Sequence, residues 1–87
     1  MKELEREAIK DLLEFYSMYV EKGNNLLVKK KAQEVEGKYL TAGPLLNEFI
    51  NLCVSKLVSF YAKIGIEPIS KEEAKEIIKR LEKTKGL

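Results

Sequence analysis

Three carboxylates on the first predicted helix are the arrangement in this chain closest to a chemical site. Glu7, Asp11 and Glu14 follow one another at steps of four and three residues, so a helix places them on one face. A row of carboxylate oxygens could bind a hard cation. A solvated acidic face explains the same pattern and is the interpretation we favour, because amphipathic helices expose charged residues to water. The sequence therefore predicts no metal ion and no other cofactor.

Residues for nucleophilic catalysis are scarce in this chain. It contains no histidine, and its single cysteine, Cys53, lies in the most apolar segment. Ser-His-Asp and Cys-His catalysis are therefore excluded, and Cys53 is expected to behave as a small buried apolar residue. The sequence also has no glycine-rich phosphate loop, zinc-ligand spacing or calcium-loop pattern. We expect a protein that is not an enzyme and that binds no small-molecule ligand.

Lysines form the second charged pattern, and they suggest an alternative function in binding a nucleic-acid backbone. The positions concerned are Lys29, Lys30, Lys31, Lys38, Lys75 and Lys79. Glutamates are interspersed among the C-terminal lysines, and the net charge of the chain is only +2. That charge is small for a protein that depends on a strong positive field. Association with DNA or RNA is therefore the alternative rather than the preferred function.

Four helices are expected to carry these side chains within a single domain, residues 1–87. Apolar residues recur with helical spacing in four segments, which predicts helices over residues 2–22, 26–39, 44–64 and 71–84. The fold class is therefore all-α, a compact bundle of two long and two short helices.

Residues that begin and end helices support these boundaries. Gly23 suits a helix C-terminus, and Asn25 can cap the helix that follows. Pro44 is suited to the first turn of the third helix, because its missing N–H has no helical partner there. Ser70 and Glu73 form a capping box that predicts the start of the last helix.

The two long helices carry more apolar surface than two short neighbours can easily cover. Apolar residues span an arc of roughly 220° on the first helix and roughly 240° on the third. We therefore predict a homodimer, or an accessory subunit that docks onto another protein. The predicted interface residues are Phe15, Met18, Tyr19, Val54, Val58 and Tyr61. Packing of the two long helices inside one chain remains the alternative explanation.

Composition gives three further expectations. No apolar run reaches the roughly 18 to 20 residues that span a bilayer, so we expect no membrane association. The first residues are densely charged and of mixed sign, unlike a secretory signal, and we expect a cytoplasmic protein. Abundant lysine, glutamate and isoleucine without histidine or tryptophan suggest a thermophilic source.

Overall fold

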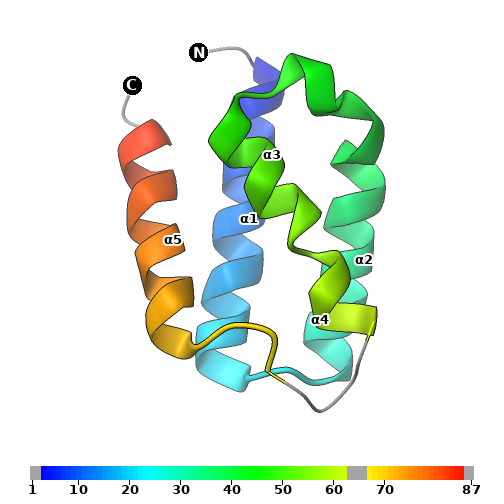
Figure 1. Cartoon of the computed structure of the whole chain (residues 1–87), viewed down its shortest axis with the longest axis vertical. Coiled ribbons are helices and arrows are strands. Elements are labelled where there is room, and N and C mark those ends of the chain that lie inside the picture. Colours follow the sequence, from blue (N-terminus) through cyan, green and yellow to red (C-terminus); the bar gives the residue numbers. More distant parts are fainter. Residues whose placement is uncertain (1–2, 63–66, 86–87) are drawn as a thin grey trace.

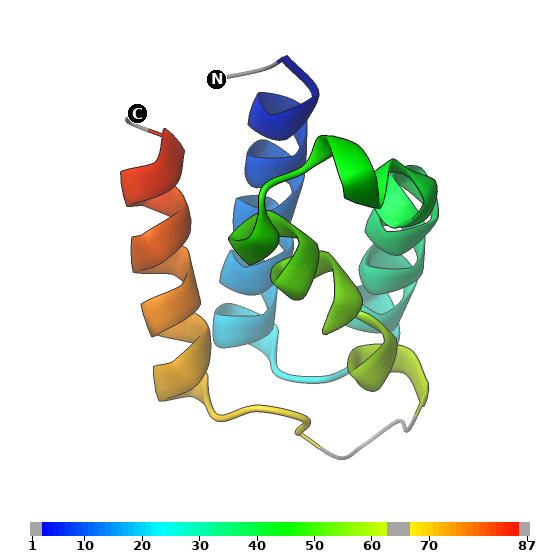
Figure 2. The same cartoon turned by 45° about the horizontal axis from the view of Figure 1, so that its top comes forward.

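The computed structural model describes residues 3–62 and 67–85, and within them the fold is an all-α bundle without strands (Figure 1). The elements are α1 (Glu3–Lys22), α2 (Leu26–Tyr39), a 3-10 helix η1 (Leu40–Leu45), α3 (Glu48–Ser55), α4 (Val58–Ala62) and α5 (Lys71–Lys85). The first helix, α1, is central: α5 packs along one side of it, and α2 packs along the other. The short helices α3 and α4 lie across the face between them (Figure 2).

Local capping sets the boundaries of α2 and α5 close to their predicted positions. Gly23 adopts a left-handed conformation with φ of 74° after α1. The side chain of Asn25 then accepts a hydrogen bond from the N–H of Val28 at 3.1 Å. At the start of α5, the hydroxyl of Ser70 accepts from the N–H of Glu73 at 3.0 Å.

The helix predicted over 44–64 is divided in the structure, which corrects that prediction. Pro44 lies inside η1 rather than in the first turn of an α-helix. The cap of α3 is Asn47, whose side chain accepts from the N–H of Ile50 at 2.8 Å. A second break separates Ser55, the last residue of α3, from Val58, the first of α4. The predicted end at residue 64 lies outside the described residues.

The second break occurs without glycine or proline, and its cause is a change in hydrogen bonding. Three backbone N–H groups donate to the carbonyl three residues earlier, as in a 3-10 helix. The pairs are Leu57 to Val54, Ser59 to Lys56 and Phe60 to Leu57, each at 3.1 Å. The hydroxyls of Ser55 and Ser59 also donate to carbonyls three residues earlier, at 2.8 and 2.6 Å. Such bonds compete with α-helical pairing and bend helices.

The break leaves the backbone carbonyl of Cys53 to another donor. In a continuous α-helix this carbonyl would accept from the N–H of Leu57, which here donates to Val54 instead. The hydroxyl of Tyr16 on α1 donates to the Cys53 carbonyl at 3.1 Å, and Tyr16 is fully buried. One side chain of α1 thus satisfies a buried polar group that the break exposes.

Phe60 occupies the centre of the aromatic core and fixes α4 against α1. Its ring packs edge-to-face on three rings of α1. The centroid distances are 4.8 Å to Phe15, 4.9 Å to Tyr19 and 6.0 Å to Tyr16. All four side chains are fully buried. The break after α3 therefore has a packing consequence, because it turns Phe60 into this cluster.

Replacing Tyr16 with phenylalanine tests the role of its hydroxyl. The Y16F variant keeps the ring but leaves the Cys53 carbonyl buried and unpaired, so we expect the free energy of unfolding to fall by about 1–2 kcal/mol. Urea denaturation measures this loss. Y61F is the matched control, because its hydroxyl bonds to Glu36 in a partly exposed position where water can replace it. Equal stability of Y16F and the wild type would contradict this assignment.

Candidate docking groove

The acidic row of α1 faces α2 and is bound by its side chains. The carboxylate of Asp11 accepts from the hydroxyl of Tyr39 at 2.6 Å and from the ammonium of Lys38 at 3.0 Å. Glu7 lies 3.9 Å from the same ammonium, and Glu14 pairs with Lys31 at 3.1 Å. The row predicted as a solvated face is thus a seam of ion pairs and hydrogen bonds between two helices.

Hydrogen bonding in this seam shifts the pKa of two groups. Burial raises the pKa of Asp11, but the hydrogen bonds from Tyr39 and Lys38 outweigh it and hold the pKa below its usual value. Burial and donation to the Asp11 carboxylate both raise the pKa of Tyr39. Tyr39 therefore stays protonated and remains a hydrogen-bond donor.

The lysines suggested for nucleic-acid binding lie on two separate parts of the molecule. Those of α2 and α5 lie on opposite sides of α1 in both views (Figures 1 and 2). Lys31 and Lys38 pair with carboxylates of α1, and Lys79 pairs with Glu76 at 3.6 Å. Among the described residues Lys29, Lys30 and Lys75 make no ion pair within 4.0 Å. The six lysines do not form one contiguous surface.

Half of the predicted interface residues are buried within the single chain, which corrects that part of the prediction. Phe15 and Tyr19 are 0% exposed and Val54 is 4% exposed. Met18 and Tyr61 are half-buried against the core, while Val58 is 46% exposed. The physical reason is that α5 covers one side of α1 and the break turns α4 onto the other elements. The wide apolar arc of α1 is therefore covered without a partner.

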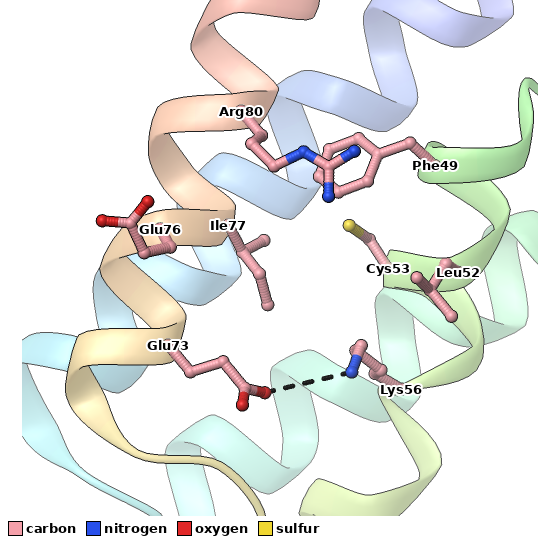
Figure 3. Close-up of a pocket in the computed structure, with 8 residues that line it drawn as sticks. All are labelled: Phe49, Leu52, Cys53, Lys56, Glu73, Glu76, Ile77 and Arg80. Atoms are coloured by element: carbon pink, nitrogen blue, oxygen red, sulfur yellow. Dashed lines mark ion pairs between the residues drawn. The ribbon is translucent and has the colours of Figure 1, made fainter.

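A groove lies between α3 and α5 (Figure 3). Both helices pack on α1, and the space between them has adjoining cavity volumes of about 420 and 260 Å³. The lining residues are Glu48, Phe49, Leu52, Cys53, Lys56, Glu73, Glu76, Ile77 and Arg80. Ile77 and Cys53 are buried, whereas Leu52 is 51% exposed. The groove thus presents apolar side chains between charged groups.

Two contacts bridge the groove, one at each end (Figure 3). The guanidinium of Arg80 lies over the ring of Phe49, 4.0 Å from its centroid. At the other end the ammonium of Lys56 lies 3.9 Å from the carboxylate of Glu73. Within the described residues Arg80 has no carboxylate partner, and Glu76 pairs with Lys79 rather than with Arg80. The guanidinium is therefore able to donate hydrogen bonds to a carboxylate of another molecule.

Cys53 lines the groove but is chemically inert there. It is 1% exposed, and burial raises the pKa of its thiol to about 12, although the nearby charges of Lys56 and Arg80 lower it. A protonated thiol is a poor nucleophile. The groove is therefore suited to binding through apolar contact and charge rather than to covalent chemistry.

Sequence reasoning missed Phe49 and Leu52 as site residues, and it considered Arg80 only as part of a basic row on the last helix. Leu52 lies within the apolar arc of the third predicted helix, where periodicity gives no reason to separate it from its buried neighbours. Its exposure follows from the distance between α3 and α5, which a sequence pattern does not encode. Arg80 lies among lysines and glutamates that look like an ordinary exposed helix face.

No family model, curated protein or solved structure matches this chain. In the part of the chain that the structure describes, no helix combines the length and apolar character needed to cross a membrane. The proposed function therefore rests on the geometry and side chains of the groove.

Replacing Asp11 with asparagine tests the seam between α1 and α2. Because the pKa of Asp11 is lowered in the folded protein, the ionised carboxylate stabilises the fold at pH values above 3.8, its ordinary pKa. This stabilisation is lost as the pH falls through the lower pKa of the folded state. At pH 7 we expect D11N to unfold with a free energy lower by about 1–2 kcal/mol. The difference in unfolding free energy between D11N and the wild type should narrow as the pH falls below about 4, the ordinary pKa of this carboxyl. Urea titrations at several pH values measure it, and a difference independent of pH would contradict the assignment.

The reactivity of Cys53 tests its burial in the groove. Since the pKa is about 12 in the folded protein against an ordinary 9.0, the thiolate at pH 8 should be roughly a thousandfold scarcer than in the unfolded chain. Ellman's reagent should therefore modify the native protein far more slowly than the guanidinium-unfolded protein. Rates within tenfold of each other would show that the thiol is accessible.

Proposed function

We propose that this protein is a non-catalytic interaction module that binds an apolar α-helical segment of another polypeptide in the groove between α3 and α5. The observation that carries the proposal is Leu52, which is 51% exposed on the α3 wall of a concave surface that combines apolar and charged side chains. Phe49 beside it is partly buried, and Ile77 forms part of the opposite wall. A concave surface with these side chains is typical of a helix-binding groove.

The shape of the groove favours a helix as the occupant. Two helices form its walls, and the side-chain ridge of a third helix can pack between them. The wall helix α3 has eight residues, which corresponds to a length of about 12 Å or two turns. Two turns of an amphipathic helix present apolar side chains at positions i, i+3, i+4 and i+7, enough to cover Phe49, Leu52 and Ile77.

Burial energy supports the same assignment. Burying a leucine side chain from water contributes about 1.5–3 kcal/mol, and a few such anchors dominate most protein interfaces. Charged groups at both ends of the groove would form the polar rim that surrounds an apolar interface centre. The exposed leucines at the start of α2, Leu26 and Leu27, lie outside this groove.

A photo-reactive residue in place of Leu52 tests the proposal in the native cells of this protein. We expect p-benzoylphenylalanine at position 52 to form a covalent adduct with a partner chain, and the same residue at position 27 to form none. Binding of the identified partner, purified and titrated against this protein, should then weaken at least tenfold for L52D because a carboxylate in an apolar interface is desolvated without a partner.

L27D is the matched control for this experiment, because Leu27 is 56% exposed and carries the same type of side chain. Its binding should stay within twofold of the wild type. Adducts from position 27 but not from 52, or equal losses for L52D and L27D, would overturn the assignment of the groove.

A further inference from the structure

The rim of the groove carries four charges whose signs alternate around it, and we call them the corner charges: Glu48, Arg80, Lys56 and Glu73. Glu48 on α3 and Arg80 on α5 line the same end of the groove. Lys56, which follows the last residue of α3, and Glu73 on α5 line the other end. Figure 3 shows Arg80 and Glu73 at opposite ends of the α5 wall. Read from the end of the groove where Glu48 and Arg80 lie, the charges along α3 are negative then positive, and those along α5 are positive then negative.

This alternation is complementary to itself under two-fold symmetry. In an isologous dimer two copies face each other across an axis that lies in the plane of contact. An axis along the groove places Glu48 against the partner copy's arginine at position 80, and an axis across the groove places it against the lysine at position 56. In either case every corner charge meets a charge of the opposite sign.

The apolar centre of the groove suits the same arrangement. Phe49 and Leu52 lie between the charged ends on the α3 wall, so a facing copy brings the same apolar side chains to the middle of the contact. The remaining carboxylate of the α5 wall, Glu76, is paired with Lys79 at 3.6 Å. Lys56 and Glu73 are likewise paired within the chain at 3.9 Å, so a facing copy would exchange this contact for contacts across the interface. Apolar contact at the centre with complementary charge at the rim is the usual composition of a specific interface.

We propose that the occupant of the groove is a second copy of this chain, bound face to face through α3 and α5 in a two-fold dimer. This inference rests on the proposed function, since it names the partner for the same groove: the helices that meet the groove are then α3 and α5 of the second copy. A segment with charges of a single sign would leave two corner charges facing a like charge, which costs affinity. A second copy matches all four corner charges at once.

Charge reversal at one corner tests the inference. Sedimentation equilibrium should give a monomer–dimer equilibrium for the wild type, and E48K should raise its dissociation constant at least tenfold because symmetry introduces the like-charge contact twice. E82K is the matched control, because Glu82 is an exposed glutamate of α5 outside the groove. Its dissociation constant should stay within twofold of the wild-type value.

Mixing variants then identifies the axis. E48K mixed with K56E should form a heterodimer tighter than either variant alone if the axis crosses the groove, and E48K mixed with R80E should do so if the axis runs along it. A wild type that stays monomeric at millimolar concentration would overturn the dimer. So would equal dissociation constants for E48K and E82K, or no gain in either mixture. A monomeric wild type with a position-52 adduct to a different protein would overturn this inference while leaving the proposed function in place.

Discussion

The edge-to-face packing of Phe60 on three rings of α1 is the interaction on which the rest of the structure depends. Phe60 reaches this position because the chain breaks between α3 and α4, and the break is tolerated because Tyr16 binds the carbonyl of Cys53. The two interactions therefore support each other. Packing of Phe60 on α1 holds α4 against the core, and the Tyr16 hydrogen bond prevents the buried carbonyl of Cys53 from being left unpaired.

Charge pairing between α1 and α2 decides which surfaces remain available. Asp11, Glu7 and Glu14 bind the lysines and the tyrosine that α2 presents to them. Two patterns that look like separate sites in the sequence, an acidic row and a basic cluster, thus partly neutralise each other in the fold. Partly exposed pairs of this kind contribute little individually, but the hydrogen bond from Tyr39 to Asp11 gives the seam a fixed register.

The groove exists because α3 and α5 both pack on α1 without closing on each other. The buried side chains of Cys53 and Ile77 line its inner surface, whereas Leu52 and part of Phe49 remain accessible on the α3 wall. The contacts of Arg80 with Phe49 and of Lys56 with Glu73 span the gap at its two ends, where a docked helix or a facing copy would meet them. Apolar surface and alternating charge in one place are the reason to propose this groove, rather than the lysines or the acidic row, as a binding surface.

Sequence periodicity and capping residues by themselves determined the all-α fold, the span of α2, and the starts of α2 and α5, because these signals act within a few residues of chain. Only the structure showed that residues 44–64 do not form one helix: Asn47 caps α3 after η1, and the break between α3 and α4 is held by the Tyr16–Cys53 hydrogen bond and the packing of Phe60 on α1. Tertiary packing likewise decided that Phe15, Tyr19 and Val54 are core while Leu52 is exposed. Helical periodicity shows only that an apolar residue is suited to burial. Whether the residue is buried depends on which helices pack against it.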